Sequence, residues 1–256
     1  MNNFGKWTVV ITWLSSWVGA GFAREFAEKW YDLLLIARNK EKTETFIKYL
    51  HVLYPNIKIS YKIFDFSKKH ELKKLEKEIT NIQHIDTLIN CIWYTSHKYF
   101  TSKKVKTPKD ILTPHDIAAM EISHTVFKKM QKEKYGNIIH VTSLLSLFAI
   151  ADDPLSATSK IFLNTHSQNL HHISTGYNIS IQTLCPRFTD IDFGKATNLA
   201  FKDKALCVKN VIKKSMHCKK EWYLVCIRGF GNTCVLTLYH ILPKKRSHQI
   251  FRRLVR

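Results

Sequence analysis

Along the chain, short continuous apolar runs alternate with longer segments in which apolar residues recur every three or four positions. The continuous runs predict buried strands, and they cover residues 7–11, 32–38, 57–66, 86–92, 137–143 and 179–186. The periodic segments predict amphipathic helices, and they cover residues 19–30, 42–54, 68–82, part of 108–134, and 160–174. Continuous apolar strands separated by such helices indicate a parallel sheet that is covered on both faces. We therefore predict an α/β fold with one doubly wound parallel sheet, whose ligand crevice lies at the carboxyl ends of the strands.

Basic residues are concentrated towards the end of the chain. The formal net charge is +20, and residues 202–256 carry 14 Lys or Arg against two acidic residues, or +12 of that total. We predict residues 1–200 as the sheet domain and residues 201–256 as a basic C-terminal extension that packs on it or trails from it. Basic and apolar residues interleave over 244–256, which is typical either of peripheral contact with an anionic membrane or of a solvated terminal helix. Nucleic acid is the weaker expectation for this extension.

The cysteines and the apolar segments indicate the cellular compartment of the protein. None of the six cysteines forms a C-x-x-C pair, and Cys91 and Cys185 lie in apolar runs where a free thiol packs as a small hydrophobe. No secretory signal peptide is predicted, and Arg228 and Asn232 argue against a membrane span over residues 222–242. We expect a cytoplasmic protein, with peripheral membrane contact as the alternative. Only eight glycines are present, so tight turns must use other residue types.

Four stretches resemble the short-chain dehydrogenase/reductase family in order and spacing. They are the turn 12–19, "DTLINCIWY" from Asp86, the segment 136–163, and "ISIQTLCPRFTDIDF" from Ile179. The resemblance covers residues 5 to 195. It implies a single Rossmann-like domain, NAD(P)-dependent chemistry on a small carbonyl or alcohol substrate, and a homodimer.

The resemblance implies a cofactor site in which glycines have been replaced. The family pattern T-G-x-x-x-G-x-G places Trp13 and Trp17 at glycine positions, where an indole takes space that the diphosphate needs. Trp93 and Arg187 replace family glycines in the same way, and Ile191 replaces a threonine that contacts nicotinamide. The position of Arg38 favours NADP over NAD. The residues that match the family's cofactor contacts are Thr12, Ser15, Ser16, Gly19, Arg38, Asp65, Asn90 and Lys160.

The implied catalytic group is incomplete. Ser143 and Lys160 match the family's serine and lysine, but Ser156 stands where the family has its tyrosine, and His115 stands where it has an asparagine. An aliphatic hydroxyl is far too weak an acid to replace a tyrosine beside an ammonium. His171 and His172 have no second pair at metal-ligand spacing, so no metal is expected.

These observations favour an oxidoreductase fold with a degenerate active site, in which the tryptophans pack as core. Two alternatives stay open. The first is an active NADPH-dependent reductase with a displaced proton donor, such as His115 or a water held by Ser156 and Lys160. The second is a basic scaffold that binds membrane or nucleic acid through residues 202–256. For Trp13, Trp17 and Trp93 the alternative to core packing is a pocket in which a flat ligand stacks on the rings.

Overall fold

The structure is a computed structural model. It describes residues 7–12, 14, 17–66, 69–91, 116–143, 146, 154–186, 201–220, 224–227, 237–238 and 241–243. Several predicted site positions and tail segments lie outside these residues, namely Trp13, Ser15, Ser16, Trp93, His115, Arg187, Ile191 and 244–256.

The described strands form one parallel sheet, which confirms the predicted fold class. Its order is β3-β2-β1-β4-β5-β6-β7. The strands β2 and β3 lie on one side of β1, and those from β4 onwards lie on the other side. The strands are β1 Thr8–Thr12, β2 Asp32–Ala37, β3 Ile59–Ile63, β4 Ile85–Asn90, β5 Gly136–Val141, β6 Ile179–Cys185 and β7 Val225–Ile227. Every residue of β4, β5 and β6 is buried, which explains why these strands read as continuous apolar runs rather than alternating ones.

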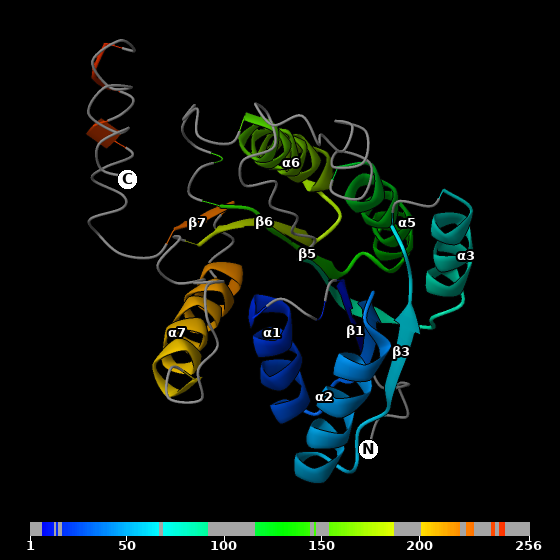
Figure 1. The fold of residues 1–256 in the computed structure, drawn as a ribbon. Coiled ribbons are helices and arrows are strands. Elements are labelled where there is room, and N and C mark those ends of the chain that lie inside the picture. The colour runs from blue at the N-terminus through cyan, green and yellow to red at the C-terminus, as the bar shows by residue number, and fades with distance from the viewer. Residues whose placement is uncertain are drawn as a thin grey trace, which may run out of the picture.

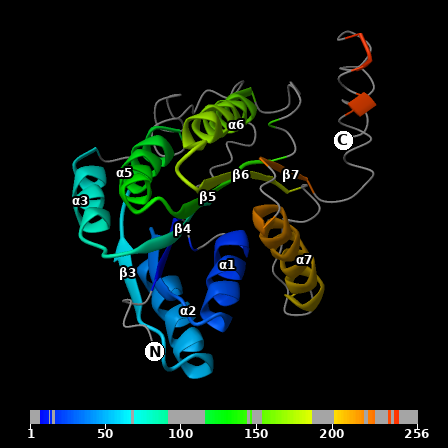
Figure 2. The same cartoon turned by 180° about the vertical axis from the view of Figure 1, so that it is seen from behind.

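Helices cover both faces of the sheet. Figures 1 and 2 show α1, α2 and α7 on one face and α3, α5 and α6 on the other. The helices are α1 Trp17–Glu28, α2 Lys40–Leu53, α3 Lys69–Thr80, α5 Ala118–Glu133, α6 Pro154–Ser174 and α7 Phe201–Lys220. Phe22 and Phe26 lie one turn apart on α1 and are both fully buried, so the predicted apolar stripe of this helix faces the sheet.

Part of the predicted C-terminal extension packs on the sheet domain. β7 pairs with β6 in parallel, and α7 packs beside α1. Gly21 permits this close approach, because a Cβ atom at that position would lie 2.4 Å from Ile212 Cδ1 and 2.7 Å from Val208 Cγ1. A larger residue at position 21 would therefore push α7 away from α1.

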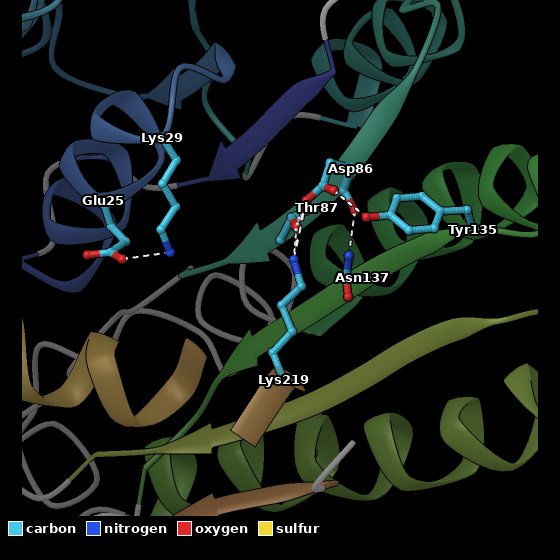
Figure 3. A network of polar contacts seen from close by, with 7 residues as sticks. All are labelled: Glu25, Lys29, Asp86, Thr87, Tyr135, Asn137 and Lys219. Atoms are coloured by element: carbon cyan, nitrogen blue, oxygen red, sulfur yellow. Dashed lines mark hydrogen bonds and ion pairs between the residues drawn. The ribbon is translucent and has the colours of Figure 1, made fainter. Parts of the chain in front are cut away.

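A polar network ties α7 to the amino end of β4 (Figure 3). Lys219 Nζ lies 3.3 Å from Asp86 Oδ1 and 3.2 Å from Thr87 Oγ1, and the Asp86 side chain is buried. Tyr135 donates its hydroxyl to Asp86 Oδ2 at 2.8 Å, and Asn137 donates to the Asp86 backbone carbonyl at 3.1 Å. Lys219 and Tyr135 thus provide partners for a carboxylate that would otherwise be costly to bury.

Residues other than glycine take left-handed conformations at two helix ends and before a strand, as the low glycine content predicted. Trp30 has φ 64° after α1, Lys134 has φ 51° after α5, and Asn178 has φ 55° before β6. After α1, Trp30 N donates to Ala27 O and Tyr31 N donates to Phe26 O, which is the hydrogen-bond pattern of a Schellman motif.

The predicted burial of two cysteines is confirmed, whereas most of the segment 222–242 lies outside the described residues. Cys91 and Cys185 are buried, and both are free thiols. Among the helices within the described ranges, none combines the length and apolar character that crossing a bilayer requires.

Candidate functional site

The candidate site lies where the central strands end. Asn90 ends β4 and Cys91 follows it, Ser143 follows β5, and Lys160 lies on α6. Asp116 lies two residues before α5. In a parallel sheet these carboxyl ends share one edge, which is where ligands bind in doubly wound folds.

Lys160 interacts electrostatically with a buried carboxyl group that the family motifs did not single out. Lys160 is 2% exposed and Asp116 is 4% exposed, and each acts electrostatically on the other. Ser159, which precedes Lys160 on α6, donates a hydrogen bond of 2.9 Å to Asp116 Oδ1. The structure therefore brings a buried acid, a buried base and a hydroxyl together between the start of α5 and α6.

Burial shifts the pKa of both ionisable groups towards neutrality. It lowers the pKa of Lys160 to about 8, against the opposing effects of Asp116 and Cys91. It raises the pKa of Asp116 to about 6, against the opposing effects of the Ser159 hydrogen bond and Lys160. Removing charge from water disfavours the ionised form of each group. Near pH 7 the pair can therefore gain or release a proton at modest cost.

Ser143 is buried at the end of β5, in a short turn. Its backbone carbonyl accepts hydrogen bonds from Ser146 N at 2.9 Å and from Ser146 Oγ at 2.7 Å. Ser156 lies on α6, one turn before Lys160, so the backbone keeps the family spacing of this pair. The catalytic roles of Ser143, Ser156 and Lys160 remain predictions.

A chain of buried polar side chains crosses the core behind the site. Thr12 Oγ1 lies 3.2 Å from Asn90 Oδ1, and Asn90 Nδ2 donates to Ser123 Oγ at 3.0 Å and to the Ala119 carbonyl at 3.2 Å. Ser123 Oγ lies 2.8 Å from His140 Nε2, and Ser167 Oγ lies 2.6 Å from His140 Nδ1. The chain thus links β1, β4, α5, β5 and α6.

The His140 ring at the centre of this chain is fully buried. Burial, with a smaller contribution from His166, lowers the pKa of His140 to about 3. The imidazole is therefore neutral at physiological pH, with one ring nitrogen donating and the other accepting. A neutral ring between two serine hydroxyls holds α5 and α6 in register on β5.

The predicted cofactor positions that the structure describes lie in different surroundings. Thr12 and Asn90 are fully buried, and the hydrogen bonds described above direct both side chains into the protein interior. Arg38 is exposed after β2, and Asp65 follows β3, the neighbouring strand. Gly19 is buried on α1. Contact of Arg38 and Asp65 with a cofactor remains a prediction, whereas Thr12 and Asn90 make hydrogen bonds within the core.

No metal site is found in the part of the chain that the structure describes. It contains no group of three or more His, Cys, Asp or Glu side chains arranged to hold an ion. His171 and His172 contact each other edge-to-face on α6, with ring centroids 6.0 Å apart.

Sequence reasoning missed Asp116, Ser123 and His140. His140 is the one signal that could have been used, since a single histidine in the apolar run "NIIHVTS" needs polar partners when buried. Asp116 carries no such signal, because its neighbours in the sequence are those of an ordinary helix start.

The family model described as short chain dehydrogenase matches residues 7–200. The chain belongs to the short-chain dehydrogenase family. Similar curated proteins include hydroxysteroid dehydrogenase-like protein 1 of Gallus gallus, 27% identical over 188 residues, and inactive hydroxysteroid dehydrogenase-like protein 1 of Homo sapiens, 25% identical over 188 residues. Each alignment covers 73% of this chain but 56% of the relative, so the chain spans little more than half the length of these proteins.

Solved structures of this family share the fold. A bulky-bulky ketone specific alcohol dehydrogenase from Comamonas testosteroni superposes with a TM-score of 0.76 at 18% identity, covering 93% of this chain and 95% of that chain. A short-chain dehydrogenase from Sphingobium yanoikuyae in complex with NADPH gives a TM-score of 0.75 at 18% identity, covering 93% and 97%. At this identity the likeness concerns the fold alone.

Proposed function

We propose that this short-chain dehydrogenase chain retains the fold of an NAD(P)(H)-dependent carbonyl or alcohol oxidoreductase but has lost conventional hydride-transfer catalysis. The observation that carries the proposal is Ser156. It stands on α6 one turn before Lys160, where the family has the tyrosine that exchanges a proton with substrate. A serine hydroxyl does not ionise near working pH, so it cannot take that role.

Two further observations support the proposal. Trp13 and Trp17 stand at the glycine positions of the dinucleotide turn, so bulky rings replace the residues that let the backbone approach a diphosphate. The similar human protein carries the word "inactive" in its name. NADP is the cofactor that Arg38 would favour if one binds.

The test measures NADPH binding by calorimetry and NADPH oxidation with a panel of carbonyl compounds. We expect no saturable binding and no turnover by the wild type. The variant Trp13→Gly/Trp17→Gly should gain NADPH binding, because the turn regains its glycines. As a control, Trp30→Gly removes a tryptophan outside the turn and should gain nothing. Carbonyl-dependent turnover by the wild type that disappears in Lys160→Ala would contradict the proposal.

The Asp116–Lys160 pair favours a second candidate, an active reductase with a displaced proton donor. NADPH, when bound, supplies the hydride in this family's chemistry. Asp116 would hold a proton at its carboxyl beside Lys160, and Lys160 would present it towards the site. A carboxyl with a pKa of about 6 suits this role better than the hydroxyl of Ser156. Turnover that is lost in both Lys160→Ala and Asp116→Asn, but kept in Ser156→Ala, would select this candidate.

A further inference from the structure

A groove on the outer surface, away from the candidate site, concentrates positive charge. It lies between α3 and α5, which pack side by side on one face of the sheet (Figures 1 and 2). Its volume is about 610 Å³, which is within the range of small-molecule sites. The described residues that line it are Lys73, Glu76, Lys77, Thr80, His124, Thr125, Lys128, Lys129 and Lys132.

The lysines form two facing rows. Lys73 and Lys77 lie one turn apart on α3, and Lys128 and Lys132 lie one turn apart on α5. None of these four forms an ion pair with a carboxylate in the described part of the chain. Like charges spaced four residues apart destabilise a helix, and here two such pairs meet across one groove. The arrangement works against folding stability, so an anion between the rows would relieve it.

Lys129 joins the two walls of the groove, and almost no acidic residue in the described lining balances the lysines. Lys129 Nζ donates to the Thr80 backbone carbonyl at 3.0 Å, which joins the end of α3 to α5. Glu76 is the single acidic residue among the described lining residues, against five lysines. The walls are thus held together while most of their ammonium groups remain unneutralised.

The chemistry of the lining indicates the class of ligand. Every described lining residue is polar or charged and five of the nine are lysines, so the groove presents ammonium groups carried on the aliphatic stems of these side chains. Ammonium groups one helical turn apart, in two rows, suit several phosphate groups better than a single one.

We propose that the groove between α3 and α5 binds a compact ligand that carries several phosphate groups. Two sources share this chemistry: a soluble polyphosphorylated molecule and the headgroup of a phosphorylated lipid. The proposal is independent of catalysis, since the groove lies on the outer side of α3 and α5 rather than at the carboxyl ends of the strands.

The test uses inositol hexakisphosphate as the soluble probe, measured by calorimetry with the full chain. We expect one saturable site whose affinity falls as ionic strength rises. The variant Lys77→Gln/Lys128→Gln/Lys132→Gln should weaken binding about tenfold or more, as expected from the loss of three charged contacts. The control Lys42→Gln/Lys48→Gln/Lys74→Gln removes the same charge from exposed positions that do not line the groove, and it should change affinity less than about twofold.

Melting temperature provides a second readout. The groove variant should melt at the same temperature as the wild type or higher, because it removes crowded like charges. The probe should raise the melting temperature of the wild type and the control, but not that of the groove variant. Absence of saturable binding, or equal weakening in both triple variants, would overturn the proposal, because the net charge alone would then explain the result.

Vesicles distinguish the two sources. Phosphatidylcholine vesicles with and without phosphatidylinositol 4,5-bisphosphate are tested for co-sedimentation. Retention that needs the phosphorylated lipid and is lost in the groove variant assigns the site to a headgroup. Binding of the soluble probe without such retention assigns it to a soluble ligand. Retention of double-stranded DNA by the groove, with neither phosphate probe bound, would refute it.

Discussion

Ser159 donates a hydrogen bond to Asp116, and this contact holds a buried carboxyl beside Lys160. The two residues come from α6 and from the segment before α5, 43 positions apart in the chain. Family resemblance led to Lys160 but not to its partner. The local chemistry of this site is therefore that of an acid–base pair near neutrality, with a serine in the tyrosine position.

Asp116→Asn should lower the pKa of Lys160 below its wild-type value of about 8, since the carboxylate of Asp116 favours the charged lysine. Side-chain NMR of the lysines would measure this, with Lys160→Arg used to assign the signal. As a matched change, Ser159→Ala should raise the pKa of Asp116 above about 6, because the carboxylate loses a hydrogen bond. An unchanged Lys160 titration in Asp116→Asn would show that the two groups do not interact.

Asp116→Asn should also change the pH dependence of stability. The folded-state pKa of Asp116 is raised, so the folded state holds a proton that the unfolded state releases between about pH 4 and 6. This group therefore makes the free energy of unfolding decrease as pH rises through that range. Denaturant titrations should show that this decrease is absent from Asp116→Asn. A decrease of the same size in both proteins would show that Asp116 does not cause it.

His140 should have the opposite effect in acid. Its folded-state pKa is lowered to about 3, so between about pH 6.5 and 3 only the unfolded state takes up a proton. Its contribution to stability is complete above pH 6.5 and should fall by about 1.4 kcal/mol for each pH unit below it.

His140→Asn removes this titration, and the comparison is made by urea unfolding between pH 7 and 5. The variant should be less stable than the wild type at pH 7, because the hydrogen bonds to Ser123 and Ser167 are changed, but it should lose less stability on acidification. The control Val52→Asn alters an exposed residue that does not titrate and should keep the wild-type slope. Parallel pH profiles for all three proteins would mean that His140 titrates normally.

Trp30 should be a site where glycine is more stable than alanine. It is 52% exposed and has φ 64° at the end of α1, a conformation that costs a residue with a Cβ atom about 1 kcal/mol or more. The free energy of unfolding of Trp30→Gly should therefore be about 1 kcal/mol higher than that of Trp30→Ala. At Lys48, an exposed position inside α2, the order should reverse, with glycine about 1 kcal/mol less stable than alanine. A more stable Trp30→Ala than Trp30→Gly would contradict the left-handed conformation at position 30.

The ion pair between Lys219 and Asp86 should be costly to break from one side. Lys219→Met keeps the bulk of the side chain but leaves a buried carboxylate without its cation, at a cost of about 3 kcal/mol. The double variant Lys219→Met/Asp86→Asn should recover much of that loss, because the uncompensated charge is gone. Thermal and chemical unfolding of the four proteins in this cycle would measure the coupling. Additive losses would show that the pair contributes nothing.

Local pattern was enough to predict the architecture. The six predicted strands correspond to β1 to β6, and in all but β3 most residues are buried, so that apolar residues follow one another along the chain. Burial of Cys91 and Cys185 follows from the same property. β3 lies at the edge of the sheet and is only partly buried. The low glycine content likewise predicted that other residues would occupy left-handed turns, though not that Trp30 would be one of them.

The shortest strand was not predicted. β7 has three residues and follows the basic helix α7, so neither length nor apolar content separates it from a loop. Its place in the sheet depends on pairing with β6 and on the packing of α7 against α1 at Gly21.

By itself, the sequence determined the doubly wound sheet, the order of its elements and the residues that match or depart from the family motifs, because these depend on local periodicity and on identity at fixed spacing. Only the tertiary structure decided that Asp116 faces Lys160, that His140 lies between Ser123 and Ser167, and that the lysines of α3 face those of α5. These relationships join segments that lie far apart in the chain, and the burial that shifts their pKa values exists only once the sheet and its helices are assembled.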